Sequence, residues 1–378
     1  FHYYAGMCDK FEGRLIPAEA PNMHNYLKWE PFGVCSLILP WNSPLGTLIW
    51  KLAPCLAAGN TVVMKPSEHS SCSTLELMEV LLEADLPPGV LNVVTGFGAG
   101  TGEPLVDHPD VRMVSFTGGT EGGRAAAGIA ARRVKPIIME LGGKSPQIVL
   151  PDADLDLAVN GVATGIFPPA GQSCISGSRL LVHRSVIEEF SDRLVTAVKK
   201  ARVGDPLDPQ TQIGPIANRL HYERVRARIE EAVKAGHRLL LDGRDACRER
   251  GYYIGPTLFA NVPNDTELAQ NEVFGPVAST EAWDDEAEAI RIANETIYGL
   301  AAGIWTRDVA KAMRMADRIE AGTVYINNYF NAATQSPVGG FKQSGYGREN
   351  GFEGMRCFMQ TKSVWLATDP IQPDPFAG

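Results

Sequence analysis

Short apolar runs alternate with amphipathic segments over the first part of the chain, between Gly33 and Gly143. The pattern predicts strands at 34–39, 61–65, 90–94 and 111–116, and helices at 47–58 and from near 73 to 83. Strands separated by helices of this size are typical of a parallel, doubly wound sheet. Such sheets bind ligands at the carboxyl ends of their strands. Asn42, Lys65 and Gly118 follow three of the predicted strands, which points to a ligand site there.

The alternation begins again after Lys144 and continues to about Phe341. It predicts strands at 147–150, 178–182, 301–305 and 323–327, with an amphipathic helix at 186–201, so we expect a second α/β domain. Two flanking segments fit neither domain: 14–30 is expected to form a hairpin and 361–367 a lone strand. Terminal strands of this kind often complete a sheet in a partner subunit. The alternative is a flap within one chain.

Composition narrows the class of protein. The chain has 378 residues, of which 44% are hydrophobic and 21% charged, as in ordinary globular proteins. A net charge of −9 with no basic cluster argues against nucleic-acid binding. The seven cysteines are scattered and form no Cys-x-x-Cys pair, so we expect reduced thiols in the cytoplasm and no metal site. No apolar run approaches the ~20 residues of a membrane span.

The strongest candidate for chemistry is Cys174. It follows a loop of prolines, glycine and small polar residues (167–173), rather than lying inside a regular element. Upstream, Glu140 ends an apolar run just before Gly142 and Gly143. A thiol nucleophile and a positioned carboxylate suffice for covalent catalysis followed by hydrolysis. Taken alone, the Gln-Ser-Cys triplet at 172–174 fits a buried structural cysteine equally well.

Two glycine-rich turns resemble nucleotide loops without matching a known fingerprint. Residues 116–124 follow a predicted strand and precede a helix, which suits a pyrophosphate. Neither this turn nor residues 96–102 match Gly-x-Gly-x-x-Gly, and a phosphate loop ending at Ser145 fails because Ile138 replaces its first glycine. Ordinary turns remain the alternative. Lys65 and Glu68 are placed to hydrogen-bond an adenosine ribose, and a carboxylate there favours NAD over NADP.

Seven short motifs occur along the chain in a fixed order, and this order is more specific than any one motif alone. They are residues 40–42 (Pro-Trp-Asn), 65–68 (Lys-Pro-Ser-Glu), 116–123 (Phe-Thr-Gly to Gly), 140–144 (Glu-Leu-Gly-Gly-Lys), 171–174 (Gly-Gln-Ser-Cys), 271–276 (Asn-Glu-Val-Phe-Gly-Pro) and 337–345 (Pro-Val-Gly-Gly-Phe-Lys-Gln-Ser-Gly). In this order and spacing, from about Glu30 to Trp365, the chain resembles the aldehyde dehydrogenase superfamily, in its hydrolytic NAD(P)-dependent branch. Family members begin well before Phe1, so the resemblance implies an N-terminally truncated chain.

The resemblance also implies the architecture. It predicts an α/β fold with a doubly wound, Rossmann-like cofactor domain, a second α/β catalytic domain and a small β oligomerisation flap. The boundaries expected are 1–31 for a partial N-terminal segment with the oligomerisation hairpin and 32–142 for the NAD-binding domain. The catalytic domain is expected at 143–345, and a C-terminal helix, oligomerisation strand and tail at 346–378. A homodimer or homotetramer follows as the expected assembly.

The resemblance implies a role for each catalytic candidate. Cys174 would attack the aldehyde to give a thiohemiacetal, with its oxyanion held by Asn42 and the Cys174 backbone amide. Hydride transfer to the nicotinamide would leave a thioester, and Glu140 would activate the water that hydrolyses it. Lys51 stands where the family often has a lysine linked to proton relay. A lysine that snorkels from the helix surface is the alternative for Lys51.

The binding residues are also carried over from the resemblance. NAD is the expected cofactor, with NADP left open. The cofactor-binding candidates are Trp41, Lys65, Ser67, Glu68, Gly98, Phe116, Gly118, Gly119, Gly123, Leu141, Glu272 and Phe274. The candidates for contact with substrate are Ser43, Trp50, Phe167, Pro168, Ser173, Tyr329, Ala332 and Val338.

Several positions depart from the family pattern. Pro169 replaces a common asparagine, Gly119 replaces a frequent serine, and Gln360 stands where many members carry a glutamate proposed for proton transfer. Small or non-aromatic residues also replace familiar aromatics around the substrate channel; they are Ser43, Pro168, Ala332 and Val338. The hypothesis is therefore a bulky or extended aldehyde. The alternatives left open are a CoA-acylating semialdehyde dehydrogenase, a thiol esterase or hydrolase, and an inactive structural member of the family.

Overall fold

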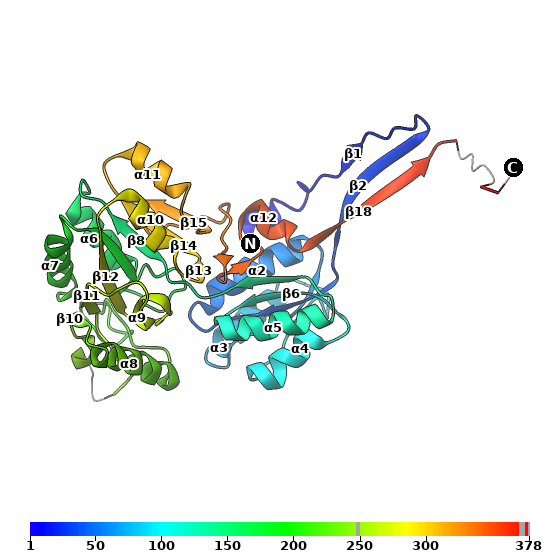
Figure 1. Ribbon diagram of the computed structural model, residues 1–378. Coiled ribbons are helices and arrows are strands. Elements are labelled where there is room, and N and C mark those ends of the chain that lie inside the picture. Colours follow the sequence, from blue (N-terminus) through cyan, green and yellow to red (C-terminus); the bar gives the residue numbers. More distant parts are fainter. Residues whose placement is uncertain (247–249, 370–374, 377–378) are drawn as a thin grey trace.

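The computed structural model describes residues 1–246, 250–369 and 375–376. These residues form two α/β bodies that lie side by side, and a narrow β arm that projects from one of them (Figure 1). We call the body around the six-stranded sheet the first body and the body around the seven-stranded sheet the second body. Among the described residues, no helix is long and apolar enough to cross a membrane.

The first body is a doubly wound sheet with strand order β17-β7-β6-β3-β4-β5. Strands β3 to β7 are mutually parallel, and β17 adds an antiparallel edge. The strands are β3 (Val34–Ile38), β4 (Thr61–Lys65), β5 (Leu91–Val93), β6 (Val111–Thr117), β7 (Ile137–Glu140) and β17 (Gly345–Tyr346). The helices are α1 (His2–Ala5), α2 (Pro44–Ala57), α3 (Ser71–Leu82), α4 (Glu103–Asp107), α5 (Thr120–Arg132) and α12 (Gly351–Arg356), with a π-helical turn at Gly98–Gly102. The four strands predicted for this region are confirmed to within one or two residues.

The second body has strand order β10-β11-β12-β9-β8-β14-β15, all parallel except β10 at one edge. The strands are β8 (Pro146–Val149), β9 (Arg179–His183), β10 (Arg238–Leu241), β11 (Thr257–Ala260), β12 (Val277–Trp283), β14 (Ala301–Trp305) and β15 (Thr323–Ile326). The helices are α6 (Leu155–Thr164), α7 (Ile187–Val198), α8 (Arg219–Lys234), α9 (Glu267–Gln270), α10 (Glu286–Asn294) and α11 (Val309–Ala316), and a 3-10 turn spans Gly243–Ala246. The second α/β unit expected from the sequence is therefore confirmed.

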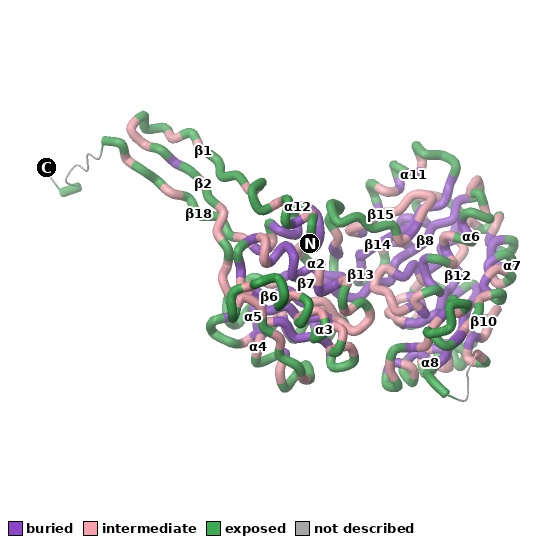
Figure 2. Tube along the Cα trace, turned by 180° about the vertical axis from the view of Figure 1, so that it is seen from behind, coloured by how far each residue is buried: buried purple, intermediate pink, exposed green. Residues whose placement is uncertain are grey.

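The arm is a three-stranded antiparallel sheet of β1 (Arg14–Ile16), β2 (Met23–Pro31) and β18 (Met359–Ala367). The prediction of a lone strand at 361–367 is wrong, because β18 pairs along its whole length with β2 of the same chain, from Met359 opposite Pro31 to Ala367 opposite Met23. Most of the arm is exposed or half-buried, whereas the central strands of both bodies are mostly buried (Figure 2). Leu15 and Trp365 are 75% and 64% exposed.

The chain crosses between the bodies at two neighbouring places. The first crossing leads from β7 to β8, through residues 141–145. The second leads from β16 (Phe341–Lys342), which pairs with β13 (Tyr298–Gly299) in the second body, to β17 in the first. The two crossings are bonded to each other, because Leu141 N–H donates to the Ser344 carbonyl at 2.9 Å.

Candidate active site

Cys174 lies in the loop between α6 and β9. The backbone of this loop is strained just before Cys174. Ala170 and Gly171 both adopt positive φ, at +51° and +68°. A Cβ on Gly171 would lie 1.8 Å from the Gly275 carbonyl oxygen, so only glycine fits. Gln172 ties the loop to the second body, since its Oε1 accepts the Ala217 N–H at 2.8 Å. The loop therefore presents Cys174 from a fixed backbone rather than from a flexible one.

The environment of Cys174 keeps its thiol protonated. Burial raises the pKa of Cys174 to about 12, and the carboxylates of Glu272 and Glu140 add to this effect. A group with this pKa is a poor nucleophile at neutral pH until its proton is removed or a positive charge comes close.

Glu140 ends β7 and is buried, with its Oε1 atom left without a hydrogen-bond partner by the described residues. Burial raises the pKa of Glu140 well above its usual range, and the charge of Glu349 raises it further, while Lys51 opposes the shift. An unpartnered carboxylate oxygen with a raised pKa is suited to take a proton from water near neutral pH. The role of Glu140 as a general base stays a prediction.

Lys51 is fully buried, so the snorkelling alternative is wrong. Its Nζ donates to Ser115 Oγ at 2.8 Å and forms an ion pair with Glu349, which is also buried. The sequence directed attention to Gln360, but Gln360 is exposed on β18 and donates to the Pro31 carbonyl at 3.3 Å. The carboxylate beside Glu140 and Lys51 is instead Glu349. Its local sequence, after Gly347 and Arg348, did not predict these contacts.

Asn42 connects the first body to the nucleophile loop. It follows β3, and its Nδ2 donates to the backbone carbonyl of Gln172 at 3.0 Å, two residues before Cys174. The predicted pair of oxyanion donors, the Asn42 amide and the Cys174 backbone amide, is thus brought into one region. Their role toward an oxyanion stays a prediction.

The start of α5 is the place where the sequence predicts a pyrophosphate site. The helix follows β6 directly, its N-cap is Gly119, and no side chain caps its free N–H groups. Close packing brings this helix to the first crossing, because a Cβ on Gly123 would lie 2.4 Å from Leu141 Cδ2. A Cβ added to Gly118 would likewise lie 2.9 Å from the Phe116 ring. The residues present therefore fit a dinucleotide pyrophosphate.

Lys65 and Glu68 lie together at the end of β4. Lys65 is buried, its Nζ donates to the Pro66 carbonyl at 2.9 Å, and Glu68 Oε2 is 3.8 Å away. Burial lowers the pKa of Lys65, and Glu68 opposes that shift. Ser67 is buried between them, and Gly98 begins the π-helical turn that ends at Gly102, against the Lys65 stem.

Glu272 is held by the first crossing. Its Oε1 accepts the Gly143 N–H at 2.9 Å, and a Cβ on Gly142 would lie 2.4 Å from its Oε2. Burial raises the pKa of Glu272 to about 7, opposed by that N–H and by Lys144. Burial also lowers the pKa of Lys144 to about 7. Glu272 thus joins Cys174 and Glu140 in one acidic region, in which Glu140 is buried and the other two are half-buried.

An aromatic cluster joins the bodies beside Glu272, and one of its members was not predicted. Trp41 and Phe274 meet edge to face at 5.4 Å, and the His221 ring lies 5.1 Å from Trp41. His221 Nε2 is 2.7 Å from the Phe274 carbonyl, and Phe274 has φ +57°. His221 on α8 therefore helps to fix Phe274; its sequence context carried no motif.

The candidates for contact with substrate fall into two groups. Ser43, Pro168 and Ala332 are exposed, and Trp50, Ser173 and Val338 are half-buried. Phe167 and Tyr329 instead lie in the hydrophobic core of the second body. Tyr329 supports the nucleophile loop, since its hydroxyl donates to the Ile175 carbonyl at 2.8 Å. Contact of any of these residues with substrate stays a prediction.

The fold is a two-body α/β architecture in which Cys174, the buried carboxyl of Glu140 and the uncapped start of α5 lie at the predicted site. The described residues contain no cluster of three or more metal-ligating side chains. The chain belongs to the aldehyde dehydrogenase family, whose model matches residues 1–364. The resemblance noted from the motifs is thereby confirmed.

Relatives and solved structures agree with this assignment. The chain is 42% identical over 373 residues to betaine aldehyde dehydrogenase of Bacillus subtilis, covering 98% of this chain and 76% of that protein. It is 42% identical over 365 residues to aldehyde dehydrogenase 1A1 of Gallus gallus, covering 96% and 71%. The structure of betaine aldehyde dehydrogenase from Staphylococcus aureus with NAD+ superimposes with a TM-score of 0.97 at 38% identity, covering 100% and 75%. The predicted enzyme class is confirmed, and the NAD+ bound to that neighbour agrees with the predicted cofactor.

Proposed function

We propose that this protein oxidises an aldehyde to the carboxylic acid with NAD+, through a thiohemiacetal and a thioester on Cys174. The observation that carries the proposal is the unpartnered Oε1 of buried Glu140, whose charge acts directly on Cys174. An unpartnered carboxylate oxygen can accept a proton, and the water that hydrolyses the thioester is a proton donor present in this reaction.

The residues divide the work as follows. The Cys174 thiol gives up its proton to solvent water and its sulfur bonds to the carbonyl carbon, while the Asn42 amide stabilises the oxygen that becomes negative. Bound NAD+ supplies the acceptor for the hydride. Glu140 then takes a proton from water as the water oxygen bonds to the thioester carbon. The carbon–sulfur bond breaks, the acid is released, and the Cys174 sulfur takes the proton that Glu140 holds, which restores the thiol.

The expected cofactor residues support NAD+ rather than NADP+. The uncapped start of α5 would hold the pyrophosphate, and Lys65 and Glu68 would hold the adenosine ribose. A carboxylate at Glu68 repels a 2′-phosphate. Glu272, held by Gly143, would take the nicotinamide ribose. A solved relative, PnpE in complex with nicotinamide adenine dinucleotide, superimposes with a TM-score of 0.95 at 42% identity.

A single-turnover experiment tests the mechanism. Glu140→Gln should form about one NADH per site and then stall, because the thioester is made but not hydrolysed. Cys174→Ala should form none, and Cys72→Ala, at an exposed cysteine in α3, serves as the matched control. Acyl-CoA formed from added CoA would favour the acylating alternative. Steady turnover by Glu140→Gln at the wild-type rate would refute the role of Glu140.

The substrate is proposed to be a bulky or extended aldehyde. Small or non-aromatic residues are exposed at three candidate substrate positions: Ser43, Pro168 and Ala332. A panel of aldehydes that includes acetaldehyde, betaine aldehyde and bulky aromatic aldehydes ranks the choices by kcat/KM. A kcat/KM that is highest for acetaldehyde and falls steadily with size would contradict the proposal.

We also propose that the protein forms a homodimer or homotetramer through the arm. Exposed apolar side chains on a thin sheet support this, namely Leu15, Tyr26, Trp365 and Leu366. Light scattering should report a dimer or tetramer for the wild type and a smaller species for Trp365→Glu. A cytoplasmic location stays a prediction, supported by the free thiols of the described cysteines.

A further inference from the structure

Ser344 lies where the two crossings meet, and it is completely buried. Its Oγ donates to the Gly142 carbonyl at 2.7 Å and accepts the Gly299 N–H at 2.9 Å. Its own carbonyl accepts the Leu141 N–H at 2.9 Å. One small side chain and its backbone therefore bond to the first crossing and to β13 of the second body.

The segments on either side of Ser344 belong to different bodies. On one side, β16 pairs with β13, with Lys342 opposite Tyr298. On the other side, β17 pairs with β7, which sets Gly345 opposite Glu140. A Cβ on Gly345 would lie 1.9 Å from the Met139 carbonyl oxygen, so the backbones touch at this point. Ser344 is thus the joint between a strand of the second body and the strand that carries the general base.

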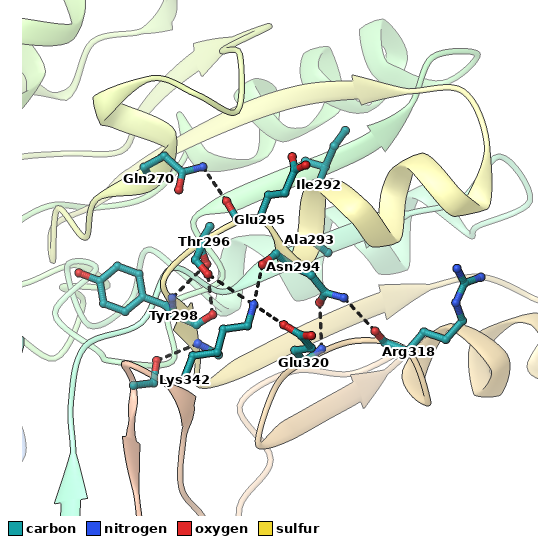
Figure 3. A network of polar contacts seen from close by, with 12 residues as sticks. Gln270, Ile292, Ala293, Asn294, Glu295, Thr296, Tyr298, Arg318, Glu320 and Lys342 are labelled. Atoms are coloured by element: carbon teal, nitrogen blue, oxygen red, sulfur yellow. Dashed lines mark hydrogen bonds and ion pairs between the residues drawn. The ribbon is translucent and has the colours of Figure 1, made fainter.

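The β16 side of this joint is anchored by Lys342. Figure 3 shows the Lys342 side chain extended toward the loop after α10 and toward Glu320. Its Nζ donates to the Asn294 carbonyl at 2.5 Å and lies 2.6 Å from Glu320 Oε2. It also reaches the Thr296 carbonyl at 3.4 Å. Because β16 is held to the second body in this way, a displacement of Ser344 would have to displace this network.

The turn that Ser344 holds carries three parts of the proposed site. Glu140 starts it, the Gly143 N–H holds Glu272, and a Cβ on Gly143 would lie 2.4 Å from the Cys174 carbonyl oxygen. The two bonds from Ser344 to the turn go to Leu141 and Gly142, between these parts. The position of the Glu140 carboxylate relative to Cys174 therefore depends on the Ser344 joint.

We infer that Ser344 is a positioning residue for thioester hydrolysis, which sets Glu140 against Cys174 across the two bodies. The inference rests on the proposed function, since it assigns Ser344 to the step that Glu140 performs. Loss of the hydroxyl releases Gly142 and Gly299 together and lets the turn shift. A shift of about 1 Å in a reacting group slows the step it serves by roughly a hundredfold.

The test compares Ser344→Ala with Thr306→Val in pre-steady-state assays. Thr306 is 2% exposed, and its hydroxyl donates to Asp152 Oδ1 at 2.8 Å in the second body, so its loss is a matched deletion of a buried hydroxyl. Ser344→Ala should hydrolyse the thioester roughly ten- to a hundredfold more slowly and show a burst of NADH before a slow steady state. Thr306→Val should keep the wild-type hydrolysis rate.

Two further readouts separate positioning from simple loss of stability. The first is Tm, which both variants are expected to lower by a similar amount. The second is the alkylation rate of Cys174 by iodoacetamide without cofactor, which should stay within about threefold of wild type if only the turn has moved. Hydrolysis by folded Ser344→Ala at the wild-type rate overturns the inference, and so does an equal slowing in Thr306→Val.

If Ser344→Ala does not fold, Lys342→Met carries the test, because it loosens β16 without removing a bond of Ser344. It should slow hydrolysis at least threefold, and an unchanged rate overturns the inference. Failure of the proposed function is recognised separately: the wild type would then form no Cys174-dependent NADH, or Glu140→Gln would still hydrolyse the thioester.

Discussion

Gly143→Ala is the substitution whose effect follows most directly from the structure. The Gly143 backbone does not require positive φ, so alanine is allowed by its conformation. The added Cβ, however, would lie 2.4 Å from the Cys174 carbonyl oxygen and 3.2 Å from Leu300 Cβ. The first contact is with backbone, which cannot rotate away as a flexible side chain would. The nucleophile loop and the first crossing must therefore move apart.

The size of the movement gives the expected loss of rate. A Cβ usually comes no closer than 3.4 Å to another heavy atom, so the separation is short by about 1 Å. If the loop and the crossing share this displacement, Cys174 moves by roughly half an ångström or more relative to Glu140. We expect kcat to fall roughly ten- to a hundredfold. The free energy of unfolding should fall by about 1–3 kcal/mol because of overpacking.

The assay is NADH formation at 340 nm with an aldehyde that the wild type accepts. Gly214→Ala is the matched control, because its added Cβ would meet no heavy atom within 4 Å and it lies in the second body, as Cys174 does. Circular dichroism establishes that both variants fold. If folded Gly143→Ala keeps at least half of the wild-type kcat, close packing of the crossing on Cys174 does not position the nucleophile.

Three further outcomes follow from the site. His221→Ala removes the bond to the Phe274 carbonyl and should raise the Kd for NAD+ about fivefold or more, measured by fluorescence titration; an unchanged Kd contradicts the role of His221. Glu349→Gln removes a charge that raises the pKa of Glu140, so the acid limb of the pH profile for thioester hydrolysis should move to lower pH; a move upward would refute the coupling. Burial raises the pKa of Glu272 from 4.5 to about 7, so its contribution to stability is complete below pH 4.5 and is lost as pH rises through 7. Glu272→Gln should therefore stabilise the protein at pH 8 relative to pH 4, by at most about 3 kcal/mol, measured by urea unfolding at each pH.

The parts of the site that follow strands could be predicted from the sequence. Buried parallel strands appear as short apolar runs, and their carboxyl ends meet at one edge of the sheet. This predicts that Asn42, Lys65 and Gly118 lie together, and β4 and β6 end at Lys65 and next to Gly118, while β3 ends four residues before Asn42. Cys174 and Glu140 could be predicted for a different reason, since their motifs contain the glycines that close backbone contacts require.

The parts that depend on packing between distant segments could not be predicted. Lys51 was open to a snorkelling interpretation because periodicity does not say what covers a helix; α12, some 300 residues later, packs on α2, and the residues before it bring Glu349 to Lys51. His221 reaches Phe274 from another helix. The lone-strand prediction failed for the same reason, since the partner of β18 lies at the opposite end of the chain.

The electrostatics of the site oppose stability, and this explains why the crossings are so tightly bonded. Glu140 and Glu272 are carboxyls close to the Cys174 thiol, Glu349 is a third carboxyl beside Glu140, and burial raises the pKa of the first two above their usual range. Burying such groups costs free energy that must come from other parts of the fold. Lys51 pairs with Glu349, whereas Glu140 Oε1 has no hydrogen-bond partner among the described residues. The backbone bonds at the crossings do not neutralise that carboxylate; they hold it in place beside Cys174, so that it stays buried and unpaired where a proton must be taken from water.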